Sequence, residues 1–298
     1  MFRTAAIILA DSSMGQPRVT SDVKVAAVAL KHVLYSALDR GPGRQLIGMV
    51  ANRRARVAGE QARFSYDPAT GSWLKQTPAG VILLPRPQGM GIEQSEVFTQ
   101  DVFLRHYAVK PGDVVLDIGA GIGSETLPFS RWVGASGKVI GVEAHPATFA
   151  TLKRACQIND VRNVELLHAA VMDSDKPVMI TDLPSEVGYE NRIGTNGIEV
   201  TALTLAGLIR KYDLDRVDFL KMNIEGAELP ALQGGSEVLP LIHNAAIGCH
   251  DFLADETGDD SYRTKDAVYE LLVNAGFTVR RRDDDPRPWA RDYLFASR

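Results

Sequence analysis

The stretch of residues 114–126 constrains the fold of this chain more than any other. It opens with VVLDI, a short apolar run that predicts a buried strand. Gly119, Gly121 and Gly123 follow at once, and a helical pattern begins at Glu125. A strand, a glycine turn and a helix N-terminus in this order form a ligand crevice at the carboxyl edge of a parallel sheet. The sequence therefore predicts an open α/β fold with a binding site at this turn.

The spacing of the glycines indicates which ligand to expect. A dinucleotide fingerprint, G-x-G-x-x-G, needs its third glycine where this chain has Ser124. Asp117, two residues before the first glycine, is a poor neighbour for a pyrophosphate and a good one for a cation. S-adenosylmethionine carries an ammonium and a sulfonium but no phosphate, so we expect this cofactor rather than NAD. A tight strand-to-helix turn without a ligand is the structural alternative.

A second predicted strand supports a nucleoside ligand. Residues 138–143, KVIGVE, end in an acid, and a carboxylate at this position can accept hydrogen bonds from both ribose hydroxyls. We expect Asp117 to hold the methionine end, directly or through water, and the glycine turn to allow close backbone approach. Glu143 is expected to bind the ribose. The predicted cofactor-binding residues are Asp117, Gly119, Ala120, Gly123, Glu143, Ala144, His145 and Ala170.

Composition bounds the class of protein. The chain has 298 residues, 45% hydrophobic and 23% charged, which is typical of a soluble globular protein. Its formal net charge of −4 disfavours an enzyme that acts on nucleic acid, since such proteins carry a basic surplus. Cys156 and Cys249 have no metal or disulfide spacing. The apolar stretch at 5–10 is too short for a membrane span, so we expect a cytoplasmic protein.

The first part of the chain differs in pattern from the rest. We expect residues 1–91 to form a small α+β extension that serves as a lid, a substrate surface or a dimer surface, or that only stabilises the protein. Its predicted elements are a helix at 21–40 and short strands at 45–50, 62–66, 73–76 and 81–84.

Strands and helices alternate over residues 92–298. This alternation predicts one domain with a mostly parallel sheet and helices on both faces, whose last two strands can be antiparallel. The further predicted helices are 94–107, 146–159, 204–212 and 262–275, and the further strands are 164–171, 177–181, 198–201, 217–223, 245–250, 277–280 and 293–296.

A resemblance to a known family rests mainly on residues 218–228. Their sequence, DFLKMNIEGAE, resembles D-x-x-K-I-D-V-E-G-A-E, the hallmark of the FkbM family of S-adenosylmethionine-dependent methyltransferases. The resemblance covers about 96–297 and implies a Rossmann-like class I methyltransferase fold with a seven-stranded sheet. It also implies methyl transfer to a hydroxyl of a sugar, glycan or secondary metabolite. The other matching segments are 112–123, 142–146, 204–205 and 250–252.

Two positions depart from the family pattern. The family usually has Asp where this chain has Asn223, and often Glu where it has Gly248. An amide cannot act as a general base, although it can still donate and accept hydrogen bonds. If the family Asp serves as a base, this chain must use another group.

The expected catalytic residues lie where the fourth and fifth strands end. His250 is the expected base because an imidazole titrates near neutrality, with a structural histidine as the alternative. Glu225 could hold substrate hydroxyls or take the proton. Lys221 could bind an acceptor oxygen, or instead form a salt bridge to a neighbouring acid. Asn223 completes the set, and Glu228 is expected to be structural, near a helix N-terminus.

Several alternatives stay open. The acidic loop at 251–260 could bind Mg²⁺, but a solvated loop is favoured, and no metal ligand is predicted. An RNA or protein methyltransferase is a second class of function. A non-catalytic cofactor-binding partner protein is a third, kept open by Asn223. We expect a small-molecule or glycan acceptor, no nucleic acid partner, and allow a homodimer.

Overall fold

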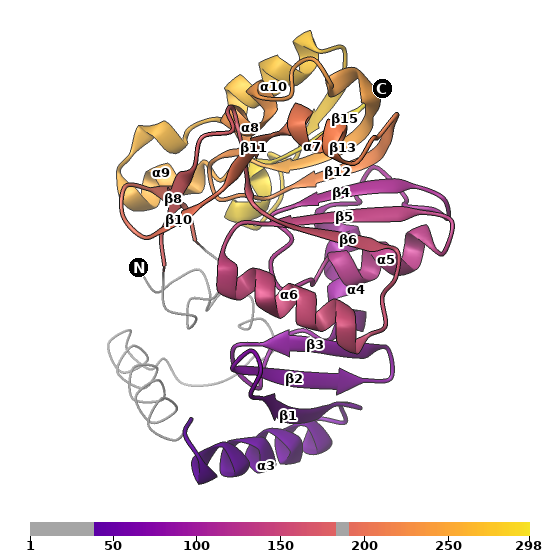
Figure 1. Cartoon of the computed structure of the whole chain (residues 1–298), viewed down its shortest axis with the longest axis vertical. Coiled ribbons are helices and arrows are strands. Elements are labelled where there is room, and N and C mark those ends of the chain that lie inside the picture. Colours follow the sequence, from indigo (N-terminus) through magenta and orange to yellow (C-terminus); the bar gives the residue numbers. More distant parts are fainter. Residues whose placement is uncertain (1–38, 183–190) are drawn as a thin grey trace.

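The computed structural model describes residues 39–182 and 191–298, and the predicted helix at 21–40 lies almost wholly outside them. A seven-stranded sheet forms its centre, in the order β14-β15-β13-β12-β4-β5-β6 (Figure 1). The strands from β13 to β6 are parallel, and β15 is antiparallel to both β13 and β14. The predicted Rossmann-like α/β fold is therefore confirmed. The strands are β4 (Val114–Ile118), β5 (Lys138–Glu143), β6 (Val164–His168), β12 (Val217–Met222), β13 (Ile242–Gly248), β14 (Thr278–Arg281) and β15 (Tyr293–Ser297).

Helices cover both faces of this sheet. Neighbouring residues of β4 point to opposite faces of the sheet. Leu116 packs with α7 (Leu205–Lys211), α8 (Glu228–Gln233) and α10 (Lys265–Asn274). Val115 packs on the opposite side with α5 (Thr126–Val133) and α4 (Ile92–Val102). A strand that is buried on both faces must be apolar throughout, which explains the continuous VVL run that the sequence shows.

The extension contains a helix where a strand was expected. Residues 45–50 belong to α3 (Pro42–Val57), so the predicted strand there is wrong. Pro42 opens the helix, and Ile47, Ala51 and Ala55 recur every four residues on its packed side. Six residues are too few to separate a period of two from one of 3.6. The other predicted strands are confirmed as β1 (Arg63–Asp67), β2 (Ser72–Thr77) and β3 (Gly80–Leu84), one antiparallel sheet.

The extension shares a core with the main sheet's layer of helices. Trp73 and Leu83 belong to the same buried cluster as Leu152 of α6 (Pro146–Ile158). At the end of α6, the Asn159 side chain accepts from the Val81 amide (2.9 Å) and donates to its carbonyl (2.7 Å). These contacts attach β3 of the extension to the C-terminal end of α6, and Figure 1 shows the three strands of the extension beside this helix. Its role as a lid or dimer surface stays a prediction.

Short strands surround the carboxyl edge of the sheet. The predicted strand at 164–171 is divided at Ala169, and the residues after the break pair with a later segment instead of continuing β6.

Two predicted helices are shorter than expected, since α4 ends at Val102 and α10 begins at Lys265. Within 39–182 and 191–298, the structure has no helix with the length and hydropathy of a membrane span. The remaining elements are β7 (Ala170–Met172), β8 (Val178–Ile180), β9 (Ile193–Gly194), β10 (Ile198–Val200), β11 (Ala202–Thr204), α9 (Phe252–Thr257) and the 3₁₀ helices η1 (Leu239–Leu241), η2 (Asp260–Tyr262) and η3 (Pro288–Asp292).

Candidate active site

A cavity of about 340 Å³ lies at the carboxyl ends of β4, β5, β12 and β13. Residues of the glycine turn, of the β8–β9 hairpin, of α4, of α9 and of η3 complete its wall. Most of the predicted site residues line it, whereas Asp117, Ala120 and Gly123 do not. The predicted residues on the wall are Gly119, Glu143, Ala144, His145, Ala170, Lys221, Asn223, Glu225 and His250.

Glu143 is held in a fixed orientation at the end of β5. One carboxylate oxygen accepts from the Gly121 amide (2.9 Å) and the other from the His145 amide (2.8 Å). Burial raises the pKa of Glu143 to about 6, against the opposing effect of these two hydrogen bonds. Each oxygen keeps a further lone pair, so the carboxylate can still accept two hydroxyl groups of a ligand.

His145 and Ala144 lie beside this carboxylate on the cavity wall. The His145 ring also caps α6, because its Nδ1 accepts from the Thr148 amide at 3.4 Å. The residue that was expected to line the adenosine therefore also fixes the start of the helix that follows Glu143.

The glycines of the turn also have packing roles, and their predicted role in cofactor binding stays a prediction. Gly119 has φ +76°, and a Cβ there would lie 2.0 Å from the Asn223 carbonyl oxygen. A Cβ on Gly123 would lie 3.0 Å from Leu152 of α6. These two glycines thus allow close packing of β4 against the end of β12 and against α6. Gly121 has φ +56° and open space at its Cβ position, so it is the glycine that leaves room for a ligand.

Asp117 and Lys221 form a buried ion pair beneath the cavity. The Lys221 Nζ lies 3.0 Å from an Asp117 oxygen and donates to the Gly119 carbonyl at 2.6 Å. Thr126 donates to the other oxygen of Asp117 at 2.6 Å. Burial lowers the pKa of Lys221, but the carboxylates of Asp117 and Glu125 raise it overall. Of the two roles considered for Lys221, the geometry supports the salt bridge, and Asp117 faces this lysine instead of the cavity.

His250 lies between two carboxylates. Its Nδ1 is 2.9 Å from Glu228 and its Nε2 is 3.3 Å from Glu225. Both ring nitrogens must carry protons to make these contacts. Burial lowers the pKa of His250, but the two carboxylates raise it well above its usual range. An imidazolium has no lone pair for a proton, so this geometry does not fit His250 as the general base.

Glu225 and Glu228 shape the turn after β12. Glu228 is fully buried and accepts from the amides of Ile224 (2.9 Å) and Gly226 (3.0 Å), which agrees with the structural role expected for it. Glu225 has φ +55° and lines the cavity. Although burial raises the pKa of Glu225, the His250 cation lowers it overall. Glu225 therefore stays ionised and paired with His250.

Glu125 is a cavity residue that sequence reasoning missed. It occupies the N-cap position of α5, directly after the glycine turn, and lines the cavity. Burial raises the pKa of Glu125 to about 7; Lys221 lowers it and Asp117 raises it further. The signal was present in the sequence, since an acid that follows the glycine turn must lie at the same sheet edge as Glu143.

The two departures from the family pattern face each other. The Tyr293 hydroxyl donates to Asn223 Oδ1 at 3.0 Å. Burial, together with Glu225 and Glu125, raises the pKa of Tyr293 well above its usual range, so the phenol keeps its proton. A Cβ on Gly248 would lie 2.6 Å from the same Asn223 oxygen. A larger residue at 248 would therefore displace the amide that Tyr293 holds.

The acidic loop after β13 is engaged in protein contacts. Arg263 pairs with Asp255 (2.7 Å) and Asp260 (3.0 Å), and Asp251 accepts from the amides of Thr264 and Lys265 (both 3.0 Å). Among the described residues, no group of three or more His, Cys, Asp or Glu side chains has the arrangement of a metal site.

Comparison with known proteins identifies the family. Residues 117–278 match the model of the methyltransferase FkbM domain, and the chain therefore belongs to the FkbM family of methyltransferases. Methyltransferase 1 of Beauveria bassiana is 25% identical over 232 residues, which cover 68% of this chain and 89% of that protein. The 31-O-demethyl-FK506 methyltransferase FkbM of Streptomyces tacrolimicus is 25% identical over 227 residues, 63% of this chain and 82% of that protein.

A solved structure shows a more distant likeness. The FkbM methyltransferase of Methylobacillus flagellatus has a TM-score of 0.42 and 18% identity to this chain, covering 63% of this chain and 44% of that one.

Proposed function

We propose that this methyltransferase is an S-adenosylmethionine-dependent O-methyltransferase acting on a small molecule, such as a sugar, a glycan or a secondary metabolite. The observation that carries this proposal is the Glu143 carboxylate on the cavity wall. Two backbone amides orient it, and its remaining lone pairs suit the neighbouring hydroxyls of a ribose. Gly121 leaves open space beside it.

The chemistry of the wall fits this cofactor. Glu125, Glu143 and Glu225 give it an acidic character that suits an ammonium and a sulfonium and disfavours a pyrophosphate. Val142 and Ile180 supply apolar surface for a purine ring. When bound, S-adenosylmethionine supplies a methyl group activated by its sulfonium.

Asn223 and Tyr293 can orient an acceptor hydroxyl. Tyr293 occupies the amide oxygen of Asn223, and no described residue accepts a hydrogen bond from the amide nitrogen. That nitrogen can donate a hydrogen bond to the oxygen of the acceptor hydroxyl. This bond fixes the direction of the hydroxyl proton and of the oxygen's other lone pair. Alignment of reacting groups contributes up to about 7–11 kcal/mol in favourable cases, so such positioning is a substantial part of catalysis.

Glu125 is the carboxylate best suited to take the acceptor proton. A general base works best with a pKa near the working pH, and burial brings Glu125 to about 7. Glu225 is less suitable because His250 holds its pKa low. We assign Glu225 to binding acceptor hydroxyls, with His250 fixing its position. With Glu125 as the base, Asn223 is no longer a reason to keep the non-catalytic alternative open.

One observation supports methyl transfer to an oxygen of a small molecule, and a second disfavours RNA as the substrate. The Streptomyces relative is named for action on an O-demethyl metabolite, and it shares most of its length with this chain. The net charge of −4 and the acidic cavity disfavour an RNA substrate.

The experiment uses S-adenosylmethionine with a trideuterated methyl group. The protein is incubated with this cofactor and a small-molecule extract of its source cells, and mass spectrometry finds the compounds that gain the label. We expect labelled methoxy groups in a small molecule, and their loss with the variant Glu125→Gln. Label recovered on nitrogen or carbon, or in RNA or protein, would overturn the proposal.

A further inference from the structure

Four aromatic residues form one wall of the cavity. Phe98 of α4 stacks with Trp289 of η3, with ring centres 6.0 Å apart and an interplanar angle of 24°. Phe103 contacts both Phe98 (6.3 Å) and Tyr293 (5.4 Å), and Trp289 contacts Tyr293 (6.3 Å). Phe103 and Tyr293 are buried, whereas Phe98 and Trp289 are only half-buried and line the cavity. We call these four residues the aromatic wall.

The two sides of the aromatic wall come from segments that share no strand pairing. Phe98 lies on α4, before the first strand of the main sheet, and Trp289 lies on η3 in the loop between β14 and β15. Their spacing must therefore be set by side chains.

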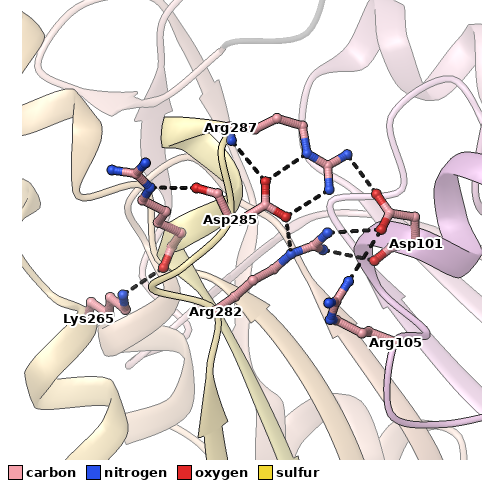
Figure 2. A network of polar contacts seen from close by, with 7 residues as sticks. Asp101, Arg105, Lys265, Arg282, Asp285 and Arg287 are labelled. Carbon is pink, nitrogen blue, oxygen red and sulfur yellow. Dashed lines mark hydrogen bonds and ion pairs between the residues drawn. The ribbon is translucent and has the colours of Figure 1, made fainter.

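A group of four charged residues joins these segments, as Figure 2 shows. We call Asp101, Arg282, Asp285 and Arg287 the clasp. Arg282 donates to Asp101 Oδ1 at 2.9 Å and to Asp285 at 2.6 Å. Arg287 pairs with the other oxygen of Asp101 at 2.6 Å and with both oxygens of Asp285 at 2.9 Å. Asp101 lies one helical turn after Phe98, so the two face the same side of α4.

The clasp is buried on its β14–η3 side and more exposed at Asp101, whose side chain is 38% exposed. The side chains of Arg282 and Asp285 are only 4% and 7% exposed. Hydrogen bonds from Arg287 and Arg282 hold the pKa of Asp285 well below its usual range. Bidentate guanidinium–carboxylate pairs also fix geometry, which isolated surface pairs do not. In addition, the Arg287 guanidinium lies 5.1 Å from the centre of the Trp289 ring and so links the clasp directly to the aromatic wall.

The aromatic wall lies next to the proposed reacting centre. Tyr293 belongs to the wall and also holds Asn223, the residue proposed to orient the acceptor hydroxyl. Trp289, which contacts Tyr293, and Phe98 therefore offer aromatic surface to an acceptor whose hydroxyl reaches Asn223. Aromatic surface of this kind favours a ring with an apolar face, and the carboxylates of the cavity disfavour an anion.

We propose that the aromatic wall, positioned by the clasp, is the acceptor-binding surface and that it takes a neutral hydroxylated molecule with an apolar ring face. This inference rests on the proposed function and narrows its acceptor class. In this account, Phe98 and Trp289 contact the acceptor, and Asp101 is a positioning residue that acts through them.

The test uses 2-naphthol, a neutral planar ring with one hydroxyl, titrated into protein saturated with S-adenosylhomocysteine. We expect saturable binding to the unchanged protein and a loss of about three- to tenfold in affinity for Trp289→Leu and Phe98→Leu, the range for one lost aromatic contact. Asp101→Asn is expected to weaken 2-naphthol binding in the same direction. In a background of Trp73→Phe and Trp132→Phe, where Trp289 is the remaining tryptophan, it is also expected to raise the quenching of Trp289 fluorescence by acrylamide. All three variants should keep their affinity for S-adenosylhomocysteine.

The control is Glu237→Gln, which breaks an exposed Arg210–Glu237 pair of 2.7 Å on another part of the surface and should leave both affinities unchanged. Equal 2-naphthol affinity in the unchanged protein and in Trp289→Leu would overturn the inference, and so would the absence of saturable 2-naphthol binding. As long as the protein still binds S-adenosylhomocysteine, these results leave the proposed function in place. Loss of both ligands in Asp101→Asn would make the clasp only structural. Failure of the unchanged protein to bind S-adenosylhomocysteine would instead reject the proposed function.

Discussion

The variant Glu125→Gln tests the electrostatics of the cavity. Burial, with Asp117 nearby, raises the pKa of Glu125 from its ordinary 4.5 to about 7. Between these two pH values the folded protein binds more protons at this site than the unfolded chain does. The free energy of unfolding therefore falls as the pH rises through this window. At about 1.4 kcal/mol per pKa unit, the full loss is about 3 kcal/mol, absent below pH 4.5 and complete above pH 7.

Glutamine resembles the protonated carboxyl and does not titrate. We therefore expect Glu125→Gln to be more stable than the unchanged protein near pH 8, by up to about 3 kcal/mol, and nearly equal to it near pH 4.5. Urea unfolding at a series of pH values, followed by circular dichroism, measures this difference. Parallel pH profiles of the two proteins, or a less stable variant near pH 8, would show that the pKa of Glu125 is not raised in the folded protein.

The same variant separates two roles for the carboxylate. If Glu125 is the general base, turnover falls about 10²- to 10⁴-fold and the affinity for S-adenosylhomocysteine changes little. A large loss of that affinity would instead assign Glu125 to the cofactor's ammonium group.

Three further variants test other parts of the site. Glu143→Ala should weaken S-adenosylhomocysteine binding by about tenfold or more in calorimetry, about 1.4 kcal/mol, and an unchanged affinity would remove the ribose assignment. Gly119→Ala places a Cβ 2.0 Å from the Asn223 carbonyl oxygen and should lower the melting temperature clearly; a normal melting curve would contradict the close approach. His250→Gln should lose stability most below pH 6.5, where the imidazolium contribution is fully present, and the gap should narrow as the pH rises through its raised pKa. A gap that does not depend on pH would show that His250 is not charged.

The fold was largely predictable because its signals are local. Residues 114–118 and 138–143 are apolar runs that end at a glycine turn and an acid, and the structure has them as β4 and β5. The segment 45–50 was not predictable in the same way, because six residues of mixed polarity fit a strand as well as one side of α3.

The candidate site was predictable in its location but not in its protonation. The ends of parallel strands meet at one edge, so Glu143 and Glu225 could be expected on one cavity wall. The positive charge of His250 depends in part on its contact with Glu228, a residue 22 positions earlier in the chain. The pairing of Asp117 with Lys221 likewise joins two strands that only the sheet order brings together.

The central claim is that the cavity holds S-adenosylmethionine against Glu143. The most direct measurement is calorimetric titration with S-adenosylhomocysteine, in parallel with NAD and with and without EDTA. We expect saturable binding of S-adenosylhomocysteine with one ligand per chain, no effect of EDTA, no binding of NAD, and a loss of affinity in Glu143→Ala. Binding of NAD, or S-adenosylhomocysteine binding that does not depend on Glu143, would contradict the central claim.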